Sequence, residues 1–96
     1  MIEASLPIGV FDSGMGGLTV LKELQSAMPA ESFIYLGDSA RLPYGNKSAH
    51  TVQQYALQAS SELVSRGVKA LVVACNTASA AALPQLTEQF APLPVF

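Results

Sequence analysis

The stretch Ala70-Leu-Val-Val-Ala-Cys-Asn-Thr-Ala-Ser79 joins a short apolar run to an alanine-rich segment through the only cysteine of the chain. An apolar run of this length without alternating polar residues predicts a strand whose two faces are both covered. The alanines that follow predict a helix that opens near Thr77. Cys75 is therefore expected where a strand meets a helix N-terminus, and this unit indicates an α/β fold.

A unit of the same kind stands at the start of the chain. Residues 8–11 predict a strand, and the glycine-rich residues 12–17 predict a tight turn after it. A helix follows, because apolar residues recur at spacings of three and four until Pro29 stops the pattern. These apolar residues are Leu18, Leu21, Leu24 and Met28.

A second unit lies between these two. Residues 33–36 predict its strand, and residues 39–47 form a long loop. Ser48 or Thr51 is expected to cap the N-terminus of the next helix, and Gly67 stands where a glycine commonly follows a helix.

Strands that alternate with helices predict parallel strands joined by right-handed crossovers. We therefore expect a doubly wound parallel sheet with a βαβαβα order, as in flavodoxin-like folds. Pro84 is expected to begin a second short helix, because proline cannot continue a helix without a kink. Residues 92–96 predict the start of a fourth strand. We therefore expect residues 1–96 to be a single partial domain, truncated at that point.

Composition excludes several classes of protein. The 96 residues are 50% hydrophobic, which suits a packed core, and the net charge of −2 shows no basic cluster that would favour nucleic acid. One cysteine cannot form an internal disulfide, and it suits a reducing cytoplasm. No basic segment precedes an apolar stretch at the N-terminus, and no apolar run is long enough for a membrane span.

The carboxyl ends of parallel strands meet at one edge of a sheet, and ligands bind there. Each predicted strand is followed by unusual polar residues, so three loops are expected to meet at this edge. These loops contain Asp12 and Ser13, residues 38–45, and Cys75, Asn76 and Thr77.

Cys75 admits two interpretations. A lone cysteine after an apolar strand is commonly a small buried apolar residue. Alternatively, the unpaired amides of a helix N-terminus create a positive potential that favours the thiolate. Asn76 and Thr77 would then act as helix caps or as donors beside the sulfur.

The other polar positions also keep a structural alternative. The turn at residues 12–17 matches neither a dinucleotide fingerprint nor a P-loop, so it is either a tight turn or a receiver of a carboxylate. The loop at residues 42–48 could be a plain turn without any role in binding a ligand. His50 is expected to be a solvated helix residue, and Asp38 with Arg41 could pair to hold the loop.

Three stretches together resemble glutamate racemase, of the aspartate/glutamate racemase superfamily. They are Gly9-Val-Phe-Asp-Ser-Gly-Met-Gly-Gly-Leu18, Tyr35-Leu-Gly-Asp-Ser-Ala-Arg-Leu-Pro-Tyr-Gly-Asn-Lys-Ser48 and Ala70-Leu-Val-Val-Ala-Cys-Asn-Thr-Ala78. They stand in the family's order and spacing. The resemblance is to the first part of these enzymes, and a second domain would follow Phe96.

The resemblance implies a cofactor-independent exchange of L- and D-glutamate by two cysteines, with no metal. It makes Cys75 one catalytic cysteine and Asp12 a catalytic residue that contacts the amino group. The substrate-binding positions that it implies are Asp12, Ser13, Tyr44, Gly45, Asn76 and Thr77. The second cysteine would lie beyond Phe96, so we expect the isolated chain to be inactive.

The resemblance further implies a cytoplasmic enzyme that supplies D-glutamate for peptidoglycan and cell-wall biogenesis, and hence for cell shape. Its partner would be a small-molecule substrate, without nucleic acid or membrane, and formation of a homo-oligomer stays open. One alternative is a racemase of another small acidic amino acid such as aspartate. Another, for the fragment alone, is a non-catalytic module that binds an anion or pairs through its sheet edge.

Overall fold

The computed structural model describes residues 5–14 and 16–96. Residues 1–4, on which the interpretation of the N-terminus partly rests, and Met15 lie outside the described residues. Three parallel strands form one sheet in the order β2-β1-β3: β1 (Ile8–Asp12), β2 (Phe33–Gly37) and β3 (Ala70–Val73). The predicted α/β class and strand order along the chain are confirmed.

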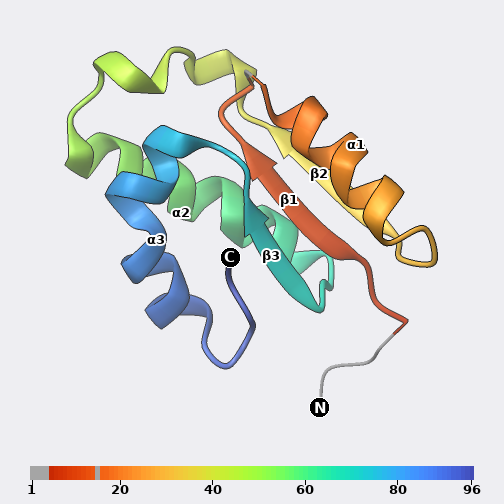
Figure 1. Ribbon diagram of the computed structural model, residues 1–96. Coiled ribbons are helices and arrows are strands. Elements are labelled where there is room, and N and C mark those ends of the chain that lie inside the picture. Colours follow the sequence, from red (N-terminus) through yellow and green to blue (C-terminus); the bar gives the residue numbers. More distant parts are fainter. Residues whose placement is uncertain (1–4, 15) are drawn as a thin grey trace.

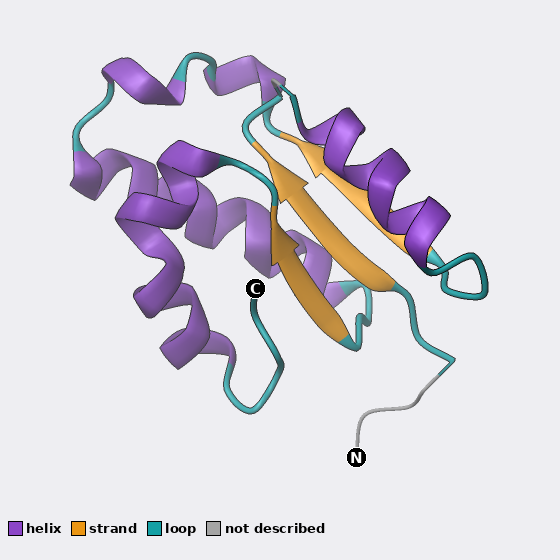
Figure 2. Ribbon diagram, viewed as in Figure 1, coloured by secondary structure: helices purple, strands orange, loops and turns teal. Residues whose placement is uncertain are grey.

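The helices form two layers around this sheet. One face carries α1 (Gly17–Ala27), and the other carries α2 (Ala49–Ser65) and α3 (Asn76–Phe90), which pack against each other (Figures 1 and 2). The long loop contains two short 3-10 turns, η1 (Ser39–Arg41) and η2 (Tyr44–Asn46). Because the three strands are parallel, the loops that follow β1, β2 and β3 all lie at the same end of the sheet.

Local signals explain where α2 begins and ends. The Ser48 hydroxyl accepts a hydrogen bond from the Thr51 amide at 3.1 Å, so Ser48 is the N-cap of the two candidates. Gly67 has a φ of +83°, the left-handed conformation in which a glycine ends a helix without strain. The predicted limits of this helix are therefore confirmed.

The prediction for Pro84 is wrong, because α3 runs through it without a break. Ala78, Ala82 and Leu86 form a buried stripe at spacings of four on both sides of the proline, and this stripe belongs to the core between α2 and α3. The Gln53 side chain donates to the Ala81 carbonyl at 2.8 Å in the turn before the proline. The packing of this stripe stabilises the helix although Pro84 lacks an amide.

The core lies mainly on the α2 and α3 side of the sheet. Phe11, Leu71 and Val73 point there and pack with apolar residues of both helices. All five residues of β1 are buried, whereas β2 and β3 are partly exposed, so only the central strand is covered on both faces throughout. Leu18, predicted on the apolar face of α1, is 59% exposed.

Residues near the C-terminus lie beside β3. Leu71 and Val95 form a parallel bridge, and the Val73 amide donates to the Phe96 carbonyl at 2.8 Å. This pairing agrees with the expected start of a fourth strand. Within the described residues, no helix combines the length and the apolar character that a bilayer crossing requires.

Candidate functional site

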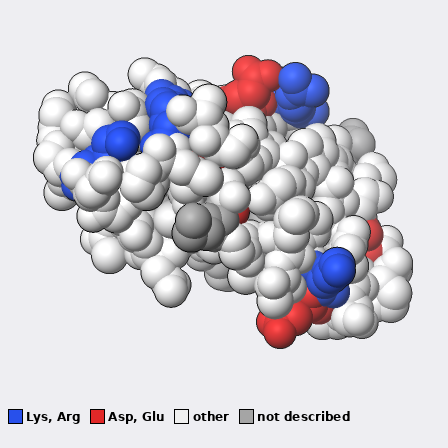
Figure 3. Space-filling model, turned by 90° about the horizontal axis from the view of Figure 1, so that it is seen from above, with Lys and Arg blue, Asp and Glu red and all other residues white. Residues whose placement is uncertain are grey.

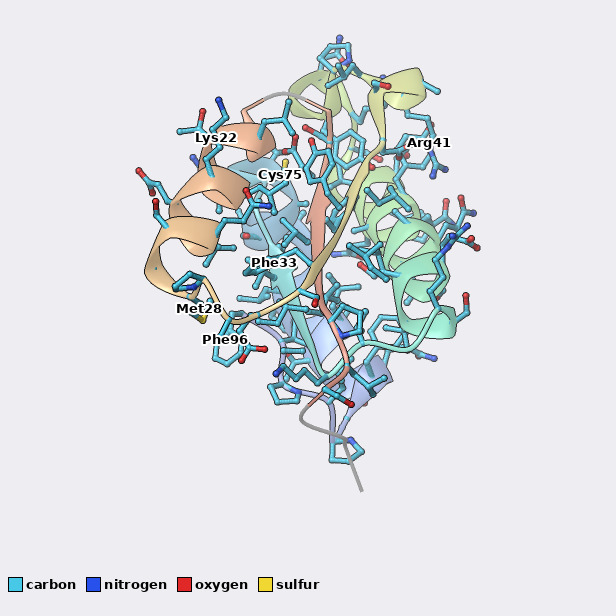
Figure 4. All side chains as sticks on the ribbon, turned by 90° about the vertical axis from the view of Figure 1, so that its right-hand side faces the viewer. Lys22, Met28, Phe33, Arg41, Cys75 and Phe96 are labelled. Carbon is cyan, nitrogen blue, oxygen red and sulfur yellow. The ribbon has the colours of Figure 1, made fainter. Side chains whose placement is uncertain are left out.

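A hollow of about 480 Å³ lies at the carboxyl ends of the strands, where the three loops meet. Six of the seven residues that were predicted for the site line it: Ser13, Tyr44, Gly45, Cys75, Asn76 and Thr77. Figure 4 shows Cys75 between α1 and α2 at the end of the sheet that carries these loops. Side chains far apart in the sequence thus share one space of amino-acid size.

Cys75 is the N-cap residue of α3. Its Sγ accepts a hydrogen bond from the Ala78 amide at 3.4 Å, and the residue is 8% exposed. An amide donor at a helix N-terminus stabilises negative charge on sulfur. The sulfur therefore lies at the wall of the hollow, where Cys75 is at the same time part of the buried core cluster.

Asp12 does not line the hollow. Its side chain is fully buried behind the turn, where Oδ2 accepts hydrogen bonds from the Gly14 amide at 3.0 Å, the Gly17 amide at 3.1 Å and the Tyr35 hydroxyl at 3.1 Å. Burial, the negative charge of Asp12 and this hydrogen bond together raise the pKa of Tyr35. The carboxylate thus anchors the turn and the start of α1.

Tyr44 is 2% exposed, and its ring packs against Phe11 and Tyr55. Its hydroxyl donates to Asp38 Oδ2 at 2.5 Å. Burial and then the hydrogen bond to Asp38 raise the pKa of Tyr44, so the phenol is neutral at physiological pH. The Tyr44 hydroxyl is therefore already engaged within the loop.

The expected pair of Asp38 and Arg41 is confirmed, with Arg41 Nε 2.8 Å from Asp38 Oδ2. His50 is exposed, as expected, and lies at a different hollow of about 540 Å³ along α2 and α3. That hollow gathers none of the residues predicted for the site.

The site residues chosen from the sequence left out several residues that also line the candidate site, although three of them lie in the turn of residues 12–17 and the loop of residues 38–45 that were expected at this edge. The residues left out are Gly16, Val20, Leu42, Pro43 and Ala74. Leu42 and Pro43 directly precede Tyr44, so their closeness in the sequence to a predicted site residue could have indicated that they belong to the site. Val20 carried no signal, because an apolar residue in a helix usually belongs to a core.

No charged side chain of the described residues lines the hollow. Seen from above, the molecule has its charged side chains in small separate groups, with much uncharged surface between them (Figure 3). The described part of the chain also has no group of three or more His, Cys, Asp or Glu side chains that could hold a metal ion. What the hollow offers a ligand is a sulfur, hydroxyls, an amide side chain and the N-terminus of α3.

No family model matches the sequence. Glutamate racemase of Thermus thermophilus is 55% identical over 96 residues, which are the whole of this chain and 37% of that protein. The crystal structure of Thermus thermophilus glutamate racemase in complex with beta-chloro-D-alanine matches with a TM-score of 0.90 and 56% identity, over 96% of this chain and 36% of that one.

Glutamate racemase from Francisella tularensis, solved in complex with D-glutamate, matches with a TM-score of 0.90 and 50% identity, over 95% of this chain and 35% of that one. The chain spans a little more than a third of the length of the Thermus thermophilus relative. By sequence and by fold, these 96 residues are homologous to a part of the glutamate racemases.

Proposed function

We propose that residues 1–96 are the N-terminal segment of a cofactor-independent glutamate racemase, in which Cys75 exchanges a proton with the substrate's Cα. The observation that carries the proposal is the position of Cys75 Sγ, which accepts a hydrogen bond from the Ala78 amide at the wall of the hollow. Racemisation removes a weakly acidic proton, so it needs a base on each face of the α-carbon. Cys75 would serve one face.

The rest of the hollow suits an amino acid. Asn76, Thr77 and Ser13 bring short polar side chains to the space beside the sulfur. The N-terminus of α3 attracts a carboxylate, and donors there stabilise the charge that develops when the proton leaves. Asp12 Oδ1 is buried and has no hydrogen-bond partner among the described residues, so Asp12 would act on the amino group only once the turn shifts to open this oxygen to the hollow.

A second base for the opposite face is required, and this chain has one cysteine. The relative in Thermus thermophilus is longer than the segment matched here, so the second cysteine would come from residues after Phe96. On this proposal the isolated segment is inactive. The full-length enzyme would work in the cytoplasm, supply D-glutamate for peptidoglycan and take glutamate as its small-molecule substrate.

The test uses the full-length protein in deuterated water. We expect deuterium at Cα of both glutamate enantiomers in the wild type, and a loss of roughly 10²–10⁴-fold in Cys75→Ala, the usual contribution of a positioned acid or base. Cys75→Ser keeps the shape and is expected to lose most activity too, because a hydroxyl is a much weaker acid. Full activity in Cys75→Ala would disprove the assigned role.

The substrate is tested in the same preparation. Competitive turnover of glutamate and aspartate is expected to favour glutamate, the substrate that the homologues' names give. Faster turnover of aspartate would replace glutamate in the proposal while keeping the reaction.

A further inference from the structure

The loop between β2 and α2 carries one wall of the hollow, and Asp38 holds it together. Asp38 Oδ2 accepts hydrogen bonds from both Arg41 Nε at 2.8 Å and the Tyr44 hydroxyl at 2.5 Å. The Asp38 side chain is 12% exposed. A single shielded carboxylate oxygen therefore joins the two 3-10 turns of the loop.

Arg41 extends this connection to helix α2. Its Nη1 donates to Gln58 Oε1 at 2.6 Å, and its guanidinium lies 4.1 Å from the ring centroid of Tyr55. Figure 4 shows Arg41 beside α2. The Tyr55 ring in turn packs 5.7 Å from the ring of Tyr44. The loop and the helix are thus linked by a connected set of side chains, here called the brace: Asp38, Arg41, Tyr44, Tyr55 and Gln58.

The brace is connected to the surroundings of Cys75 through Tyr44. Tyr44 and Cys75 belong to one buried cluster, and Leu42, Pro43, Tyr44 and Gly45 line the hollow together with the sulfur. The geometry of this wall depends on Tyr44, whose hydroxyl is bonded to Asp38. Besides this hydrogen bond, the wall is held by the packing of the buried Tyr44 ring against Phe11 and Tyr55.

We propose that Asp38 and Arg41 are positioning residues, which hold the Tyr44 and Gly45 wall against Cys75 and so keep the hollow shaped for its substrate. The role of Tyr44 follows from the same geometry, because its hydroxyl is bonded to Asp38 and therefore belongs to the brace. The proposal rests on the proposed function only where it names the substrate. Its first test, which follows, needs no substrate.

The first test measures the alkylation rate of Cys75 by iodoacetamide in the full-length protein, read by mass spectrometry of the peptide that carries Cys75. Asp38→Asn weakens both hydrogen bonds of the carboxylate, and Arg41→Lys keeps the charge but loses the planar fork and the stacking. We expect alkylation to accelerate roughly tenfold in each, the factor that corresponds to one weakened charge-assisted hydrogen bond.

Glu62 in α2 and Arg66 at its C-cap provide matched controls, since this exposed pair is also an arginine–carboxylate contact, with Arg66 Nη2 3.0 Å from Glu62 Oε1. Glu62→Gln and Arg66→Lys are expected to leave the alkylation rate unchanged. Low concentrations of urea separate local opening from global unfolding, because only the global route accelerates steeply with urea. Unchanged rates in the brace variants, or rates that follow global unfolding, would overturn the proposal.

The second test measures glutamate turnover in the same variants. We expect KM for both enantiomers to rise roughly tenfold in Asp38→Asn and Arg41→Lys. Tyr44→Phe is expected to change both readings in the same direction as Asp38→Asn. The double variant Asp38→Asn/Tyr44→Phe is expected to be no worse than Asp38→Asn alone, since Tyr44→Phe removes a bond that Asp38→Asn already weakens. A rise in KM for Tyr44→Phe without faster alkylation would instead mean that the hydroxyl contacts substrate, which contradicts the brace.

The two tests distinguish failure of the proposed function from failure of the proposed brace. If the wild-type protein does not racemise glutamate, the proposed function is lost, while the alkylation rates still decide whether the brace holds the wall.

Discussion

Asp12 is buried beside the candidate site without lining its hollow, and its carboxylate organises the turn after β1. One oxygen accepts three hydrogen bonds, and two of the donors are backbone amides, those of Gly14 in the turn and Gly17 at the start of α1. Buried amides without a partner are costly, so the carboxylate is required for this turn whatever it does for a ligand. The Tyr35 hydroxyl is its one side-chain donor among the described residues.

Tyr35→Phe removes that donor and leaves the ring in place. We expect a loss of about 1 kcal/mol in the free energy of unfolding, because the hydrogen bond has a charged acceptor but is partly open to water. Urea denaturation measures it. Tyr55→Phe is the control, since the Tyr55 hydroxyl makes no hydrogen bond with the described residues, and its effect should stay within about 0.5 kcal/mol. Equal losses in both variants would contradict the role of the Tyr35 bond.

At the scale of elements, the junction between β1 and α1 depends on close packing. A Cβ on Gly17 would lie 2.4 Å from both Cβ and Cγ of Asp12, so no side chain fits between the helix and the carboxylate. Gly16 and Gly14 have φ values of +87° and +107°, which the turn requires and glycine adopts without strain. The glycine-rich sequence is thus explained by the turn itself.

Gly17→Ala is expected to destabilise the protein by about 3 kcal/mol, at the upper end for overpacking, because Asp12 or the helix must move. Gly45→Ala serves as the control, since a Cβ there would meet nothing within 4 Å. Its free energy of unfolding should remain within about 0.5 kcal/mol of wild type. Chemical denaturation of the two variants side by side provides the measurement, and similar stability would show that the junction can relax.

At the scale of the whole molecule, stability comes from the layer between the sheet and the pair α2 and α3. Leu71, in β3, is completely buried there, whereas Leu18, on α1 at the other face, is 59% exposed. The same residue type therefore occupies opposite environments in the two layers. Burial and not hydrophobicity alone should decide what each contributes.

Leu71→Ala is expected to cost about 2–5 kcal/mol, through lost burial and a cavity, whereas Leu18→Ala should change stability by no more than about 0.5 kcal/mol. Thermal and urea unfolding of the two variants test this. A large loss for Leu18→Ala would mean that the α1 face is covered by something in solution. A small loss for Leu71→Ala would place the main core elsewhere.

Much of the fold was predictable because its signals are short-range. Ser48 bonds the amide three residues later, and Gly67 takes its conformation from its own missing side chain. Polar residues after each strand predicted the edge where the hollow lies, since parallel strands must bring their carboxyl ends together. Six of the seven predicted site residues line that hollow for this reason.

The amino-acid sequence by itself determined the alternation of strands and helices and the position of Cys75 ahead of α3. These features follow from periodicity, glycine and capping within a few residues. Only the tertiary structure decided that α3 continues through Pro84, that Asp12 lies behind the turn, and that Arg41 ties its loop to α2. Each of these rests on contacts between distant segments, such as Asp12 with Tyr35, 23 residues apart, and Arg41 with Gln58, 17 residues apart. Such contacts depend on how the layers pack, which no local pattern specifies.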